Sequence, residues 1–133
     1  MAASRFTTFL DTFDPDSKIR GTQWEHVCKW FFETDPVYRA QLKKVWLWDK
    51  WPGRWGADAG IDLVAQATDG TLWAIQAKAY APDSSVTKKD MDSFLSESAR
   101  TEFAYRLLIA TTGHVSAAAI RASTSAEKPV STL

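Results

Sequence analysis

Two polar residues interrupt an otherwise apolar segment between residues 72 and 80 of the 133-residue chain. Gln76 and Lys78 are two positions apart, so their side chains share one face of a strand. A lysine buried without a partner costs several kcal/mol, which predicts a carboxylate nearby. Asp62, on the far side of the Asp69-Gly70 turn, is the acid that a hairpin would bring to this neighbourhood. Asp62 and Lys78 therefore form either a structural ion pair or part of a chemically active site.

The helices and strands that must position these residues follow from the spacing of apolar side chains. A helix over residues 22–33 is predicted by an apolar stripe at i, i+3, i+4, i+7 and i+8, formed by Trp24, Val27, Cys28, Phe31 and Phe32. Asp35-Pro36 ends this helix, and a short helical piece at 36–43 follows. Strands are then predicted at residues 45–51, 61–68 and 72–80. The Asp69-Gly70 pair predicts that the last two form an antiparallel hairpin.

The second half of the chain continues with alternating helices and strands. A helix over residues 87–98 places Met91, Phe94 and Leu95 on one side, with Ser84 or Ser85 as its cap. Residues 105–112 have the apolar character of a buried strand, and a last helix is expected from Ser116. This order indicates an α/β fold with a mixed central sheet flanked by helices.

Composition excludes several classes of protein. The chain has 16 Lys and Arg against 16 Asp and Glu, so it is not a strongly basic domain. No apolar run approaches the roughly 20 residues of a membrane span, and the first 20 residues lack the apolar core of a signal peptide. Cys28 is the only cysteine and is expected to be a buried thiol, while His26 and His114 are the only histidines, which disfavours zinc sites. We therefore expect one cytoplasmic domain at residues 21–133 after an N-terminal extension at 1–20.

Positive charge is concentrated in one segment, residues 36–55, where five basic residues stand against one acid. Aromatic residues are interleaved with this charge: Tyr38, Trp46, Trp48, Trp51 and Trp55. This mixture could contact phosphates and stack on bases. The alternative is a solvated basic face whose aromatic side chains point into the core.

Gly60-Ile61-Asp62, followed by Gln76-Ala77-Lys78, resembles the signature of the PD-(D/E)xK nucleases in its Mrr-like variant, in which glutamine replaces the second acid. Glu25 stands where that family has a glutamate on the preceding helix. The expected element order is also similar to the αβββαβ core of restriction endonucleases. The stretch at residues 48–65 resembles nuclease domains at the N-terminus of type I single-polypeptide (type ISP) restriction enzymes and related helicase-nucleases. The resemblance covers about residues 21–123.

The resemblance implies a Mg²⁺-dependent DNA endonuclease that hydrolyses phosphodiester bonds in a restriction or anti-phage system, with Mn²⁺ expected to substitute. In that family's arrangement, Asp62 binds the metal, completed by the Gln76 side chain, the Ala77 carbonyl and Glu25, directly or through water. Lys78 would orient the attacking water and offset charge in the transition state. A neutral glutamine at position 76 is expected to weaken metal binding.

Further expectations concern DNA contacts and partners. The residues expected to contact DNA phosphates are Lys43, Lys44, Arg54, Lys88, Lys89 and His114, whereas Asp58 is expected to be a turn residue. The partner is double-stranded DNA, with no membrane contact. The sequence has no Walker A motif, so a helicase or translocase and specificity modules would lie elsewhere in the polypeptide or in associated proteins. Two-strand cleavage implies a transient dimer. The alternatives are a structure-selective resolvase or repair nuclease, and a catalytically silent DNA-binding module of the same fold.

Overall fold

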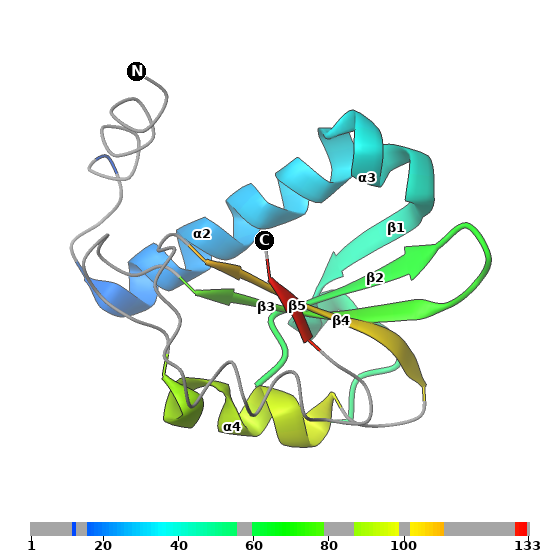
Figure 1. The fold of residues 1–133 in the computed structure, drawn as a ribbon. Helices are drawn as coiled ribbons and strands as arrows, with labels where there is room; N and C mark the ends of the chain where they lie inside the picture. Colours follow the sequence, from blue (N-terminus) through cyan, green and yellow to red (C-terminus); the bar gives the residue numbers. More distant parts are fainter. Residues whose placement is uncertain are drawn as a thin grey trace.

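A five-stranded mixed sheet, in the order β1-β2-β3-β4-β5, forms the centre of the molecule. The computed structural model describes residues 12, 16–55, 60–78, 87–98, 102–110 and 130–132. Helices α2 and α3 lie over one face of the sheet and α4 lies over the other (Figure 1). The expected α/β architecture with a mixed, helix-flanked sheet is therefore confirmed.

Helix α2 (Ser17–Thr34) carries the predicted apolar stripe but begins earlier than residue 22. The side chain of Asp16 accepts a hydrogen bond from the backbone N–H of Ile19 at 3.1 Å, so it caps a polar first turn that an apolar pattern does not reveal. Trp24, Cys28 and Phe32 are buried, as predicted. Asp35 then caps α3 (Pro36–Gln41) by accepting from the N–H groups of Val37 and Tyr38.

The first strand differs from its expected range. β1 (Leu42–Leu47) begins directly after α3, and residues 48–50 form a 3₁₀ turn, η1 (Trp48–Lys50), instead of continuing the strand. Trp48 and Trp51 leave the sheet to pack together at 5.5 Å between ring centroids, and the ring of Trp51 lies 5.6 Å from that of Phe103. Burial of these large rings outweighs the strand propensity of the segment.

The predicted hairpin is present. β2 (Leu63–Ala67) and β3 (Leu72–Lys78) are antiparallel, with Leu63 opposite Ile75. Gly70 has φ +89°, and the Asp69 carboxylate accepts hydrogen bonds from the N–H and the hydroxyl of Thr71. These bonds lower the pKa of Asp69 and stabilise the turn.

The rest of the sheet is parallel. β4 (Phe103–Ala110) runs parallel to β3, and β5 (Val130–Thr132) runs parallel to β4. β5 was not predicted, because its three residues lie in a Ser- and Thr-rich end without a strand pattern. The predicted helix from Ser116 lies outside the described residues, as do the Ser84 and Ser85 caps.

Each face of the sheet buries its own hydrophobic cluster. Leu63, Ala65 and Ile75 pack with the buried face of α2, and Val64 and Ala74 pack with α4 (Lys88–Glu97). Arg106 on β4 is also buried, and its guanidinium donates to the Leu95 carbonyl at 3.0 Å and to the Ser98 hydroxyl at 3.1 Å. It thereby ties the end of α4 to the sheet. Within the described part of the chain, no helix is long and apolar enough to cross a membrane.

Candidate active site

Asp62 lies immediately before β2 and is fixed by three hydrogen bonds. Its N–H donates to the Ile75 carbonyl at 3.0 Å, and its own carbonyl accepts from the Trp48 N–H at 2.9 Å. Its carboxylate oxygen Oδ2 accepts from the backbone N–H of Ala77 at 2.8 Å. The side chain is therefore held across the hairpin against the backbone between Gln76 and Lys78.

The side chain of Gln76 carries a buried oxygen atom without a hydrogen-bond partner among the described residues. Its side chain is only 4% exposed, and its Oε1 has no hydrogen-bond partner within the part of the chain that the structure describes. A buried acceptor left in this state costs about 1–3 kcal/mol. Lys78, two residues further along β3, is half-buried on the same face. The amide oxygen thus lies on the strand face of Lys78, beside the backbone segment that holds Asp62, and can accept a hydrogen bond or bind a cation.

Glu25 is connected to this site through Cys28. Burial raises the pKa of the Cys28 thiol above its usual range, and the carboxylates of Asp62 and Glu25 raise this pKa further. Both carboxylates must therefore lie within electrostatic range of the same thiol. Cys28 is fully buried and stays protonated, which makes it a structural residue rather than a nucleophile.

The donor set suits a hard divalent cation. Two carboxylates, one amide oxygen and the Ala77 carbonyl are the oxygen ligands that Mg²⁺, Mn²⁺ and Ca²⁺ prefer. Among the described residues, no group of three or more His, Cys, Asp or Glu side chains could hold a metal ion. Gln76 adds no carboxylate to Asp62 and Glu25, and Asp58 lies outside the described residues. The residues fit a divalent ion that keeps several of its waters.

The residues expected to contact DNA do not all lie at this end of the sheet. Lys44 on β1 is opposite Gln66, which is four residues from Asp62, or about 13 Å along the strand. Lys43 and Lys44 are exposed, and the Lys44 ammonium lies 5.4 Å from the centre of the Trp46 ring. These two lysines therefore belong to a separate surface.

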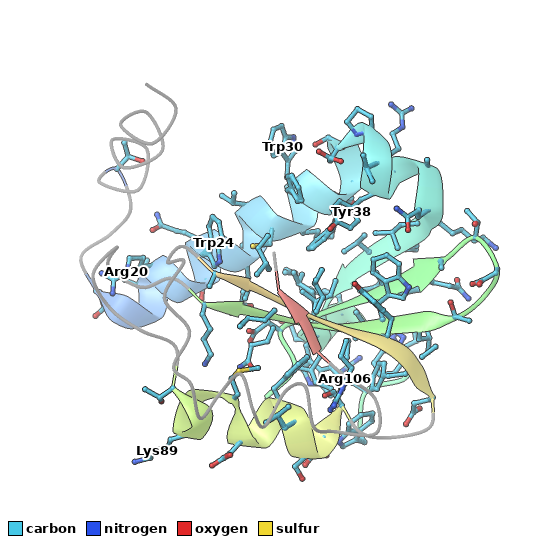
Figure 2. All side chains as sticks on the ribbon, viewed as in Figure 1. Arg20, Trp24, Trp30, Tyr38, Lys89 and Arg106 are labelled. Carbon is cyan, nitrogen blue, oxygen red and sulfur yellow. The ribbon has the colours of Figure 1, made fainter. Side chains whose placement is uncertain are left out.

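The remaining residues expected to contact DNA lie in the loop after η1, on α4, and outside the described residues. Arg54 is exposed but donates from Nη1 to the Trp51 carbonyl at 2.9 Å. Lys89 is exposed on the first turn of α4, on the same side of the view in Figure 2 as Arg20. The side chain of Lys88 and all of His114 lie outside what the structure describes.

The aromatic residues of the basic segment are mainly core residues. Trp48 and Trp51 are 5% and 6% exposed, and Trp46, Trp55 and Tyr38 are partly buried against the two clusters. Base stacking by the buried pair is therefore wrong, and the alternative of aromatic side chains turned into the core is confirmed for them. No role was predicted for Trp30, although its position off the apolar stripe of α2 indicates exposure, and Trp30 is 63% exposed.

A family model for restriction endonucleases, Mrr_cat_2, matches residues 33–133. This match contains Asp62, Gln76 and Lys78 and begins after Glu25. The chain belongs to this restriction endonuclease family. The predicted resemblance to Mrr-like PD-(D/E)xK nucleases is thereby confirmed.

Solved structures of restriction enzymes share the fold of this restriction endonuclease domain. The DNA-bound ATP-dependent type ISP restriction-modification enzyme LlaBIII is 26% identical, with a TM-score of 0.78 over 98% of this chain. MspJI, in complex with an oligonucleotide, is 18% identical with a TM-score of 0.60 over 97% of this chain, and the DNA modification-dependent endonuclease AspBHI is 15% identical with a TM-score of 0.61 over 98%. This chain spans 8%, 28% and 32% of these proteins respectively. No curated protein matches it.

Proposed function

We propose that this domain is a Mg²⁺-dependent DNA endonuclease that hydrolyses phosphodiester bonds in a restriction or anti-phage enzyme. The observation that carries the proposal is the fixed carboxylate of Asp62 beside the buried, unsatisfied Oε1 of Gln76. This pair, together with Lys78 on the same strand face, lies in a restriction endonuclease fold. A purely structural hairpin gains nothing from a buried amide oxygen without a donor.

The roles of the residues follow from their chemistry. Asp62, Glu25, the Gln76 amide and the Ala77 carbonyl would hold Mg²⁺, or Mn²⁺ in its place. The bound ion would polarise the scissile phosphate and lower the pKa of the attacking water. Lys78 donates a hydrogen bond to that water and offsets the negative charge that develops on the phosphate. The hydrogen bond from the Ala77 N–H would hold the Asp62 carboxylate in place during the reaction.

The neutral side chain at position 76 determines how tightly the site binds metal. Two carboxylates attract a divalent ion less strongly than three, because the local negative charge is smaller. We infer that free protein needs millimolar Mg²⁺, and that phosphate oxygens of bound DNA complete the coordination. Tight Mg²⁺ binding without DNA would contradict this inference.

Duplex DNA would lie over the end of the sheet that carries Asp62 and Lys78. Lys89, together with Lys88 and His114, would contact backbone phosphates there, and Arg54 would contribute from the loop after η1. Because this chain spans only 8% of the type ISP enzyme, we propose that translocation and sequence recognition reside in other modules. A transient dimer would supply the second active site for two-strand cleavage. The cytoplasm is the proposed location.

The experiment that tests the proposal is plasmid nicking and linearisation with Mg²⁺, with Mn²⁺ and with EDTA. Wild type is compared with Asp62→Asn and Lys78→Met, and Asp49→Asn and Lys50→Gln serve as matched controls, because both are exposed on η1. Metal-dependent cleavage that both site variants lose and both controls keep is the expected result. Cleavage that persists in EDTA, or in Asp62→Asn, would overturn the proposal.

A further inference from the structure

A series of hydrogen bonds connects Asp62 to Arg54. The Trp48 N–H donates to the Asp62 carbonyl at 2.9 Å, and the Trp51 N–H donates to the Trp48 carbonyl at 3.1 Å. The Arg54 N–H then donates to the Trp51 carbonyl at 3.3 Å, and the same carbonyl accepts from Nη1 of Arg54 at 2.9 Å. Both the backbone and the guanidinium of Arg54 are therefore held in place relative to the acid of the candidate active site.

Tryptophan rings anchor this segment against the sheet. Trp48 and Trp51 are buried in the cluster that contains Ala74, on the face of the sheet that α4 covers. Trp55 follows Arg54 directly, and its ring lies 5.0 Å from that of Trp48 and 6.2 Å from that of Trp51. Arg54 thus projects from a short turn that packed aromatic side chains hold on both sides.

Gly53 lies directly against the indole of Trp51. A methyl group at position 53 would be 2.6 Å from Cζ2 of Trp51 and 2.9 Å from Cε2 and Cη2. Carbon atoms in contact are about 3.5–4.0 Å apart, so either the ring or the turn would have to move. The ring is confined, because it is 6% exposed and lies 5.6 Å from the ring of Phe103. A side chain at position 53 would therefore displace the turn that carries Arg54.

This turn lies on the same side of the sheet as the candidate active site. Ala74 packs in the same cluster as the two buried tryptophans, and Gln76 and Lys78 follow it on β3 at intervals of two residues, which places them on the same face. Paired residues in a ladder are about 5.5 Å apart and the ends of a turn are less than about 7 Å apart, so Arg54 lies within about 20 Å of Asp62. B-form DNA has about one base pair per 3.4 Å of its axis, so a duplex at Asp62 reaches Arg54 within about six base pairs.

We propose that Arg54 binds a backbone phosphate of duplex DNA a few nucleotides from the cleaved bond, and that Gly53 and Trp51 are positioning residues for this contact. The inference rests on the proposed nuclease function and adds a fixed point of substrate binding to it. Arg54 is exposed, and its guanidinium uses one N–H for the Trp51 carbonyl and has others for phosphate oxygens. A guanidinium held before DNA arrives loses less rotamer freedom on binding. A single fixed orientation suits phosphates, because they recur at every nucleotide whatever the sequence.

The test is fluorescence anisotropy of the full chain with two short labelled duplexes of unrelated sequence, in EDTA. Without metal, binding is measured whether or not the domain cleaves DNA. Arg54→Gln and Arg54→Lys test the phosphate contact, and Arg39→Gln is the matched control, because Arg39 is exposed on α3, over the opposite face of the sheet. Gly53→Ala tests the positioning, and Gly21→Ala is its control, because a methyl group at position 21 has no atom within 4 Å.

We expect Arg54→Gln to weaken binding of both duplexes roughly tenfold or more. It should also lower the slope of log affinity against log salt by ~0.9, whereas Arg54→Lys keeps the charge and should keep the slope. Gly53→Ala should weaken binding to a similar extent as Arg54→Gln. The double variant Gly53→Ala/Arg54→Gln should bind no more weakly than Arg54→Gln, because the glycine acts only through the arginine. Gly21→Ala and Arg39→Gln should bind as wild type.

Four results would overturn the inference: no duplex binding by wild type, an unchanged salt slope in Arg54→Gln, a loss confined to one of the two duplexes, or a further loss in the double variant. The third result would assign Arg54 to a base edge, and the last would make Gly53 a structural residue only. Thermal melting checks that Gly53→Ala folds, which is expected because its turn is exposed, and an unfolded variant would equally remove the positioning role. A failed nuclease proposal would appear instead as uncut plasmid, with duplex binding and its dependence on Arg54 intact.

Discussion

The Ala77 N–H donates a 2.8 Å hydrogen bond to Oδ2 of Asp62, and this bond joins the two halves of the site. Ala77 lies between Gln76 and Lys78 on β3, whereas Asp62 precedes β2. The bond occupies one carboxylate oxygen and fixes the direction of the other. It is also the geometric reason why two residues fifteen positions apart in the sequence can act on one ligand.

Replacing Asp62 by asparagine or by alanine should distinguish its contribution to DNA cleavage from its contribution to the stability of the fold. Asparagine keeps an oxygen that can accept from the Ala77 N–H, so Asp62→Asn should leave the melting temperature nearly unchanged while it lowers cleavage at least about 100-fold. Alanine removes the acceptor as well, and Asp62→Ala should lose about 1–3 kcal/mol of unfolding free energy. Urea unfolding and plasmid cleavage measure the two effects. Equal stability of the two variants would show that the bond contributes nothing.

Restoring an acid at position 76 should strengthen metal binding. Gln76→Glu adds a third carboxylate beside Asp62 and Glu25, so we expect the Mg²⁺ or Mn²⁺ concentration for half-maximal binding to fall about tenfold or more. Isothermal titration with Mn²⁺ and no DNA measures the change. Gln66→Glu, a change of the same chemistry on β2, is the control and should leave metal affinity as in wild type. Unchanged affinity in Gln76→Glu would place the metal elsewhere.

The hairpin of this fold was predictable because local chemistry decides it. Asp69-Gly70 favours the turn, and the alternation along β3 places Gln76 and Lys78 on one face, next to Asp62. The family signature then supplied Glu25, which lies too far away in the sequence for any spacing argument. The residues alone left open whether Asp62 and Lys78 form a structural ion pair or part of a chemically active site, because the register of a hairpin is uncertain until its strands are paired.

Features decided by tertiary packing were less predictable. Trp48 and Trp51 have strand propensity, yet they leave the sheet because their rings can be buried beside Phe103. Arg106 lies within an apolar strand, and the sequence alone does not show that the end of α4 provides acceptors for its guanidinium. β5 has three residues and pairs with β4 across the sheet, so its existence depends on a neighbour rather than on its own pattern.

Arg106 should be important for stability rather than for cleavage. It is 2% exposed and donates to the Leu95 carbonyl and the Ser98 hydroxyl, while burial lowers the pKa of its guanidinium. Arg106→Met fills a similar volume but leaves these acceptors without a donor, so we expect a loss of about 1–3 kcal/mol in unfolding free energy. Urea denaturation measures the loss, and Arg39→Met, an exposed arginine, should stay within about 0.5 kcal/mol of wild type. A loss as small as that of the control would mean that the two hydrogen bonds are dispensable.

Cys28 should make the stability of the domain depend on alkaline pH. Burial of its thiol, and then the charges of Asp62 and Glu25, raise its pKa far above the ordinary value of about 8.5. Above that pH the unfolded thiol ionises while the native thiol keeps its proton. The native state then binds more protons than the unfolded state, and the free energy of unfolding falls as pH rises. The slope contributed by this group approaches about 1.4 kcal/mol per pH unit.

The measurement is the unfolding free energy of wild type and Cys28→Ala between pH 7.5 and 10, obtained by urea denaturation. Other groups titrate over this range in both proteins, so the difference between the two curves isolates the thiol. Wild type should lose stability faster than Cys28→Ala once the pH exceeds about 8.5. Parallel curves would show that the thiol ionises as readily in the folded protein and would contradict its burial.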